Sequence, residues 1–273
     1  MPPGGRTKPV DLVFVLDATL STQSIFKAMI DQVNDIGFDL HTTFRQAVLN
    51  YGAIIYRDPV DWRPLPPMPV FVNDGTYEVP PPDEDEDNNH YDLEKYPENR
   101  NVAIDLCDNI ETIITELEKV KCCSGHDDPE DWVGALTLAL NDIHWRDGKK
   151  CIVWIADANA HGKRYCGFDN HNEEEPKMEP LVRRLAEENF YFVGINVMKG
   201  TDTGCQITLR EMKSIYERYH GKSFMIQEFK PVYDHQRYND DNWPDDVLDM
   251  FMQTVAATLN RSMADAFDRP DDF

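Results

Sequence analysis

Asp11-Leu-Val-Phe-Val-Leu-Asp17-Ala-Thr19-Leu-Ser21 joins a continuous apolar run to three oxygen-bearing side chains at alternate positions. A strand buried on both faces has such an uninterrupted apolar run, and open α/β sheets bind ligands beyond the carboxyl ends of their strands. Asp17, Thr19 and Ser21 offer one carboxylate and two hydroxyl oxygens to a hard cation such as Mg²⁺. The same residue types cap helices, so a strand followed by a helix cap is the alternative interpretation.

A second stretch, Lys150-Cys-Ile-Val-Trp-Ile-Ala-Asp157, repeats this design, because its apolar run also ends on an aspartate. Parallel strands of one sheet end at the same edge. We therefore expect Asp157 to lie near Asp17.

The remaining apolar residues alternate between helical spacing and strand-like runs. Helices are predicted at 23–40, 101–120, 129–145, 179–189, 209–219 and 245–261, and further strands at 44–56, 70–72, 190–197 and 223–226. The run at 70–72 is expected at an edge because Pro69 lies beside it. This β/α alternation predicts an α/β fold: a doubly wound, Rossmann-like parallel sheet of about six strands, with helices on both faces and one short antiparallel edge strand.

The domain organisation is expected to be simple. Residues 10–262 are predicted to form a single domain, preceded by a flexible N-terminus at 1–9 and followed by a C-terminal tail at 263–273. The stretch at 79–90 is rich in proline and acidic residues, which indicates an insertion outside the sheet.

The charge balance restricts the partners. The chain has 27 Lys and Arg against 50 Asp and Glu, a formal net charge of -23. This charge opposes binding to nucleic acid or to an anionic membrane and favours cations and basic partners, for which the acidic run at 83–87 is a candidate contact. The apolar runs are too short for a signal peptide or a membrane span, so a cytoplasmic location is expected.

The six cysteines show no CxxC spacing and are expected to be reduced thiols. Adjacent Cys122 and Cys123 leave a redox role as an alternative to simple packing. His161, Cys166 and His171 recur at five-residue intervals, a spacing that fits neither a compact zinc turn nor a helical pair. His161 is expected to pack in its loop, or to act in the outer shell of the metal.

Three segments together give the chain a family resemblance. They are Asp17-Ala-Thr-Leu-Ser21, the turn Gly125-His-Asp-Asp-Pro-Glu-Asp131 before a helix, and Asp157. With them, nearly the whole chain resembles a von Willebrand factor type A (vWA) domain. That family carries a metal-ion-dependent adhesion site (MIDAS) that begins with Asp-x-Ser-x-Ser, of which the stretch from Asp17 is a threonine variant, and ends with an aspartate that Asp157 matches.

Within this superfamily, three further segments resemble the A domains associated with atypical alpha-type protein kinases. They are Arg57-Asp58, Pro129-Glu-Asp-Trp-Val-Gly-Ala-Leu136 and Ile155-Ala-Asp-Ala-Asn-Ala-His-Gly162. No glycine-rich phosphate loop or other nucleotide motif accompanies them.

The resemblance implies a site for Mg²⁺, with Mn²⁺ or Ca²⁺ as alternatives, and a protein partner whose Glu or Asp completes the coordination. The implied ligands are Asp17, Thr19, Ser21, Asp128 and Asp157. Asp128 replaces the family's usual threonine, and Asp127 is the alternative after a shift of one residue. Asp58, Asp127 and His161 are expected at the rim of the site.

Two other functions compete with a metal-dependent binding module. One is a vWA scaffold that binds no metal, which fits the presence of Asp128 where the family usually has a threonine ligand. A Mg²⁺-dependent phosphoryl-transfer enzyme would also end an apolar strand with aspartate, but Thr19 occupies the position of its second acid and no complete catalytic set is present. We therefore predict that the chain is not an enzyme.

Overall fold

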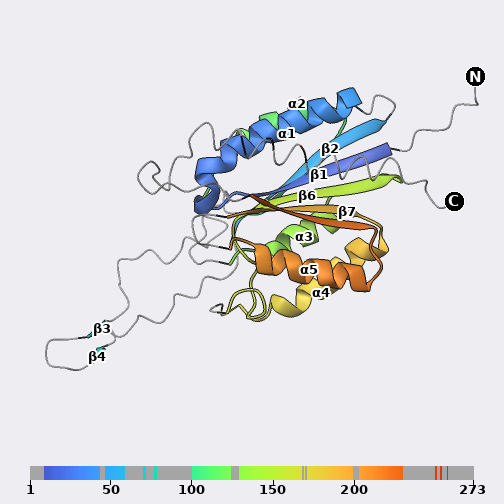
Figure 1. Ribbon diagram of the computed structural model, residues 1–273. Coiled ribbons are helices and arrows are strands. Elements are labelled where there is room, and N and C mark those ends of the chain that lie inside the picture. The colour runs from blue at the N-terminus through green and yellow to red at the C-terminus, as the bar shows by residue number, and fades with distance from the viewer. Residues whose placement is uncertain are drawn as a thin grey trace, which may run out of the picture.

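A six-stranded sheet with the order β5-β2-β1-β6-β7-β8 forms the centre of the protein (Figure 1). The structure is a computed structural model that describes residues 9–43, 47–58, 70–71, 77–78, 100–123, 129–167, 169, 171–198, 203–229, 250, 253 and 257. Five strands are parallel: β1 (Pro9–Asp17), β2 (Val48–Tyr56), β6 (Lys149–Ala156), β7 (Tyr191–Val197) and β8 (Ser223–Phe229). The edge strand β5 (Val102–Cys107) is antiparallel to β2.

Helices cover both faces of this sheet, which confirms the predicted doubly wound α/β fold (Figure 1). On one face lie α1 (Gln23–Thr43), which follows a 3₁₀ turn at Leu20–Thr22, and α2 (Ile110–Leu117). On the other face lie α3 (Trp132–Asn141), α4 (Glu175–Glu187) and α5 (Gln206–Arg218).

The buried apolar run of β1 serves both faces. Leu12, Phe14 and Leu16 pack with α1 and α2, whereas Val13 and Val15 pack with the helices of the other face. All five side chains have no solvent exposure. Because successive residues of a strand point to opposite faces, a central strand needs apolar residues at every position.

The order of the strands reverses between β1 and β6. The chain leaves β1 toward β2 on one side, and it leaves β6 toward β7 on the other. Leu16 pairs with Ile155 across this junction, so the residues that follow the two strands meet at the topological switch point, where open α/β sheets bind ligands.

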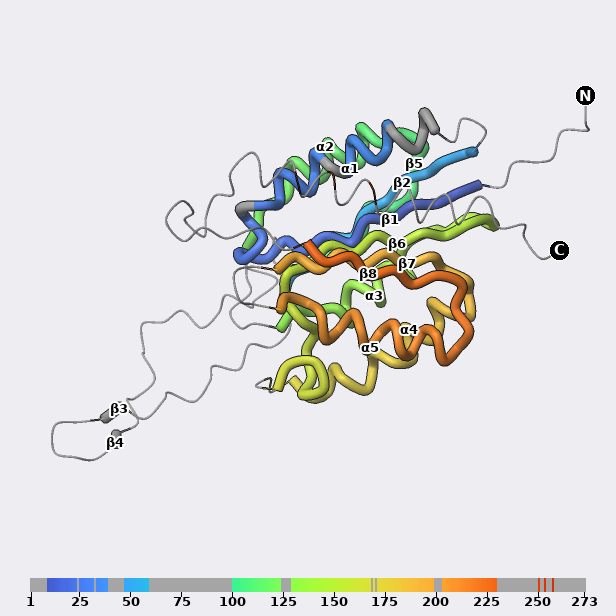
Figure 2. Tube along the Cα trace, in the orientation of Figure 1, coloured from blue at the N-terminus to red at the C-terminus, as the bar shows by residue number. Residues whose placement is uncertain are grey.

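Two predicted elements are wrong in part. The helix expected at 101–120 begins as β5, because Val102, Ile104 and Leu106 also satisfy the period of two that defines a strand. Figure 2 shows β5 beside β2 at one border of the sheet and β8 beside β7 at the other. The run at 70–72 is not an edge of this sheet, since β3 (Val70–Phe71) pairs with β4 (Tyr77–Glu78) in a separate two-stranded sheet.

One further predicted helix is shorter in the structure, and several predicted segments lie outside the described residues. The helix expected at 129–145 is shorter, because Asp131 caps it and it ends at Asn141. Pro9, expected in the N-terminal segment, begins β1, whereas residues 1–8, the insertion at 79–90 and the tail at 263–273 lie outside the described residues. The closing helix expected at 245–261 does too, except for residues 250, 253 and 257, which are helical.

At the amino end of β1, a partly buried ion pair joins the strand to the segment after α3. The Arg146 Nε donates to Asp11 Oδ1 at 2.6 Å, and the Arg146 backbone N donates to Asp11 Oδ2 at 2.7 Å. The guanidinium also donates to the carbonyl oxygens of Val10 and Val48. The Arg146 side chain therefore connects β1, β2 and the segment before β6, and its partner Asp11 is buried.

Asp11→Ala is expected to lower the free energy of unfolding by about 2 to 4 kcal/mol, because it leaves part of the Arg146 hydrogen bonding without a partner. Urea unfolding measures this loss. The control is Asp105→Ala, which removes the partner of the exposed His144 and should cost below about 1 kcal/mol. Equal losses in the two variants would contradict the assignment.

Candidate functional site

Asp17 organises the turn between β1 and α1. Its Oδ1 accepts hydrogen bonds from the Thr19 backbone N at 2.9 Å and from Thr19 Oγ1 at 2.7 Å. The Thr22 hydroxyl donates to the carbonyl oxygens of Asp17 and Thr19 at 2.9 and 3.0 Å. These local contacts fix the turn, and both Asp17 and Thr19 are fully buried.

The predicted oxygen ligands continue from this turn to β6. The hydroxyls of Thr19 and Ser21 are 3.0 Å apart, and Ser21 Oγ donates to Asp157 Oδ1 at 3.1 Å. The structure therefore brings together Asp17, Thr19, Ser21 and Asp157, whereas Asp127 and Asp128 lie outside the described residues. Each hydroxyl has a carboxylate that can take its hydrogen, which leaves oxygen lone pairs for a cation.

Neutral aromatic donors hold the Asp17 carboxylate from the other side. The Tyr56 hydroxyl donates to Asp17 Oδ2 at 3.4 Å, and Trp154 Nε1 donates to the Tyr56 hydroxyl at 3.2 Å. Burial and then the Asp17 charge raise the pKa of Tyr56 well above its ordinary value. The tyrosine thus stays a neutral donor, and it orients Asp17 without cancelling its charge.

The cysteine pair lies beside this turn. The Cys123 backbone N donates to the Ala18 carbonyl at 3.0 Å, and Cys122 packs against the apolar cluster of the α1 face. Burial is the main cause that raises the pKa of the Cys122 thiol to about 11. Because the thiolate is the reactive form, packing explains Cys122 better than a redox role.

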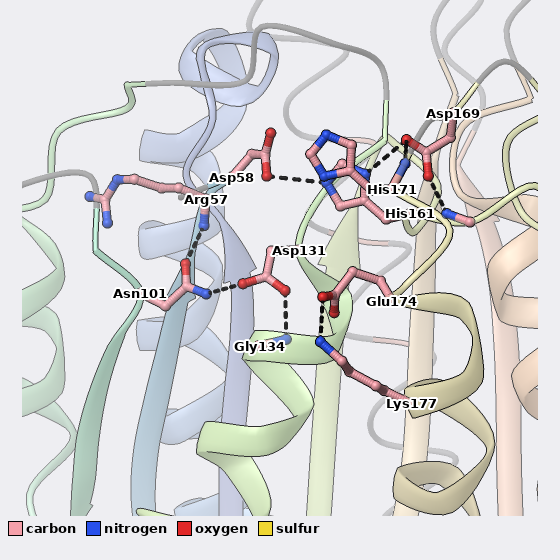
Figure 3. A network of polar contacts seen from close by, with 11 residues as sticks. Arg57, Asp58, Asn101, Asp131, Gly134, His161, Asp169, His171, Glu174 and Lys177 are labelled. Carbon is pink, nitrogen blue, oxygen red and sulfur yellow. Dashed lines mark hydrogen bonds and ion pairs between the residues drawn. The ribbon is translucent and has the colours of Figure 1, made fainter. Parts of the chain in front are cut away.

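A second polar cluster surrounds His161 (Figure 3). His161 Nε2 lies 3.1 Å from Asp58 Oδ1, and His161 Nδ1 lies 3.3 Å from Asp169 Oδ1. The rings of His161 and His171 stack with centroids 4.4 Å apart. The two predicted rim residues Asp58 and His161 are therefore in contact with each other.

Asp169 is a functional candidate that the sequence analysis missed. Burial raises the pKa of this carboxyl, but the hydrogen bonds from the Gly162 and His171 backbone N–H groups, together with His161, outweigh burial and lower the pKa below its ordinary value. The sequence did carry a signal for Asp169, because it lies two residues before His171 and eight after His161. The five-residue intervals between His161, Cys166 and His171 directed attention to Cys166 instead.

A third group of contacts fixes the start of α3 (Figure 3). Asp131 Oδ1 accepts from the Gly134 backbone N at 2.6 Å, and its Oδ2 accepts from Asn101 Nδ2 at 2.7 Å. The Asn101 side chain accepts in turn from the Arg57 backbone N at 2.9 Å. Asp131 is thus the helix cap and also connects α3 to the turn after β2.

These features define the class of the protein: a Rossmann-like α/β fold with buried polar side chains at its topological switch point. No family model matches the chain, and no curated protein matches its sequence. None of the helices in the described part of the chain has both the length and the apolar character that a membrane span requires.

The solved structures that match the chain include those of three different proteins. The pilus adhesin SpaC from Lactobacillus rhamnosus GG, in its open conformation, gives a TM-score of 0.50 at 11% identity over 93% of this chain and 30% of that chain. The proximal thread matrix protein 1 of the mussel byssus gives a TM-score of 0.48 at 14% identity, over 92% of this chain and 46% of that chain. The SpRpn10 VWA domain gives a TM-score of 0.49 at 8% identity, over 89% of this chain and 95% of that chain. The chain spans less than half of the mussel and adhesin chains, and the likeness to the adhesin is one of fold.

The stability of the protein should depend on the ionisation of Asp131. Burial is the main cause that raises the pKa of Asp131 to about 6, from an ordinary value of 3.8. Because the folded-state pKa is the higher one, the protonated carboxyl favours the folded state below about pH 4, and this contribution is lost as the pH rises through about 6.

Asp131→Asn keeps an oxygen acceptor for the helix cap but cannot ionise. Relative to this variant, wild type should lose up to about 3 kcal/mol of unfolding free energy between about pH 4 and pH 7. Urea unfolding at several pH values measures the difference. Parallel pH profiles for the two proteins would contradict the raised pKa.

Proposed function

We propose that the chain is a vWA-type module that binds a protein partner through a divalent cation at the carboxyl ends of β1 and β6. The observation that supports this proposal best is the spacing of the oxygens from Thr19 to Ser21 to Asp157, at 3.0 and 3.1 Å. Adjacent ligands of an octahedral Mg²⁺ at 2.0–2.1 Å lie about 3.0 Å apart, so the oxygens already have the spacing of one side of such a shell.

The proposed roles follow from the hydrogen bonds. Thr19 and Ser21 bind the ion through their hydroxyl oxygens. Asp17 and Asp157 bind it directly or through water, take the hydroxyl hydrogens and supply negative charge. Asp128 or Asp127, which precede α3 in the sequence, is the candidate for a further protein ligand. Mg²⁺ is the preferred ion, with Mn²⁺ and Ca²⁺ as alternatives, because all of these donors are oxygens.

One coordination position is assigned to a Glu or Asp of the partner. Leu20 lies between the two hydroxyl residues in the sequence and is 54% exposed. An exposed apolar side chain beside a cation suits a protein partner, because a carboxylate contact can be surrounded there by apolar contacts. No disulfide joins the six cysteines, all of which lie in the described part of the chain, and this supports a place in a reducing compartment inside the cell.

Within the vWA class, we place the chain nearest to the A domains associated with alpha-type kinases. The three segments that resemble those domains contact one another: Asp58 reaches His161, Glu130 bridges to Ala160, and Trp132 Nε1 donates to the Ala158 carbonyl at 3.1 Å. The three segments are therefore neighbours at the carboxyl edge of the sheet and not three separate motifs. A binding role without catalysis fits this edge, since Thr19 stands where a phosphoryl-transfer enzyme would need its second acid.

Asp17→Asn should abolish the response of the protein to Mg²⁺. This variant keeps an oxygen acceptor for Thr19 but removes the charge, whereas a cation at a hundred times its Kd stabilises wild type by about 2.7 kcal/mol. Thermal unfolding with EDTA and then with Mg²⁺, Mn²⁺ or Ca²⁺ measures the shift. Asp35→Ala, which removes an exposed acid on α1, should respond as wild type does. A wild type that ignores all three ions would favour the metal-independent scaffold.

Partner binding should follow the same pattern. Proteins retained by immobilised wild type in Mg²⁺ should be released by EDTA, retained by Asp35→Ala, and absent from Asp17→Asn. Ser21→Ala tests the hydroxyl separately, because Ser21 is exposed and the Asp17 hydrogen bonds do not depend on it. Equal retention by wild type and Asp17→Asn would show that the partner does not use the cation.

A further inference from the structure

We propose that His161, Asp169 and His171 form a second metal site, which takes Zn²⁺ or a similar transition-metal ion. A ligand atom from each of the three side chains lies within 4.8 Å of the others. The three residues are buried, with 2%, 5% and 4% of their surfaces exposed. Two imidazole nitrogens and one carboxylate suit Zn²⁺ or Co²⁺, in contrast to the oxygen donors near Asp17.

One edge of the coordination shell is already formed. His161 Nδ1 and Asp169 Oδ1 are 3.3 Å apart, and a tetrahedral ion at 2.0–2.1 Å from both atoms requires about 3.3 to 3.4 Å. The Asp169 carboxylate is held in place, because the Gly162 backbone N donates to its Oδ2 and the His171 backbone N donates to its Oδ1.

The contacts of the two His161 ring nitrogens also support an ion between His161 and Asp169. Each ring nitrogen faces a carboxylate, Nε2 toward Asp58 and Nδ1 toward Asp169. A neutral imidazole has one N–H, so one of these contacts would join two acceptors unless a proton or a metal ion lies between them. If Nε2 donates to Asp58, the lone pair of Nδ1 can bind an ion that Asp169 also binds, and Asp58 becomes the outer carboxylate that orients a ligand histidine.

His171 supplies a separate reason. Its Nδ1 is buried and has no hydrogen-bond partner among the described residues. A buried polar atom without a partner is costly, and coordination would satisfy this nitrogen. The planes of the two stacked rings differ by 16°, whereas an ion must lie in the plane of each ring that binds it. We therefore assign to ion binding a rotation of the His171 ring about its Cβ–Cγ bond.

An ion at this site would connect segments that are distant in the sequence. His161 follows β6, Asp169 and His171 precede α4, and Asp58 follows β2. With three protein ligands, a water molecule completes the tetrahedral shell. The site would hold these loops together at the carboxyl edge of the sheet, a role that does not depend on the proposed binding of Mg²⁺.

Cobalt titration of the full chain after removal of metals with a chelator tests the site, because tetrahedral Co²⁺ absorbs visible light. Wild type should bind one equivalent with visible absorption, and Zn²⁺ should displace it. His171→Gln and Asp169→Asn should lose the absorption, while Asp58→Asn should weaken Co²⁺ binding by about 10- to 100-fold. His144→Gln, which changes an exposed histidine, is the matched control and should bind as wild type does.

Other outcomes would overturn the proposal. They are a wild type without visible absorption and without Zn²⁺ binding, unchanged binding by a folded His171→Gln, or loss of Co²⁺ binding in Asp17→Asn alone. The last outcome would assign the ion to the oxygen site, so the two proposals can fail separately. If His171→Gln does not fold, X-ray absorption of the zinc-loaded wild type decides: two imidazoles in the shell support the site, and a shell of oxygens alone overturns it.

Discussion

The pairing of β1 with β6 is the constraint on which the polar edge of this protein depends. Leu16 lies opposite Ile155, and both strands are buried on both faces. Because side chains alternate along a strand, a slip of one residue in this register would exchange the faces and displace the polar residues that follow. Ser21 reaches Asp157 across 136 positions of sequence because the apolar runs fix where each strand ends.

Carboxylates at this edge have different environments, although the whole chain is strongly acidic. Asp169 accepts two backbone N–H groups and faces His161, and the pKa of its carboxyl is lowered. Asp131 also accepts two hydrogen bonds, but burial and the charges of Asp58 and Glu174 outweigh them, so its pKa is raised to about 6. The balance of burial, donors and neighbouring charge thus decides which carboxylates can serve a cation at neutral pH.

The sequence predicted what its apolar periodicity encodes. The runs before Asp17 and Asp157 identified two central strands and the edge where they end, and the structure brings these residues together. The pattern at Val102, Ile104 and Leu106 satisfies both a strand and a helix, so only the pairing with β2 decided it. Asp58 and His161 are 103 positions apart, and Asp169 lies in an irregular loop, so no periodicity could connect them.

The two proposed cation sites share one loop, which gives them a physical relation. Asp157 and His161 are four residues apart after β6, and the Glu130 bridge to Ala160 holds this loop against the start of α3. Oxygen ligands alone select hard cations, while imidazole selects borderline ions, so the two sites need not compete for one metal. A zinc-type ion that fixes His161 would reduce the freedom of Asp157. Mg²⁺ binding would then cost less conformational entropy, because the loop that carries Asp157 is already ordered. One ion can favour the binding of another in this way without direct contact.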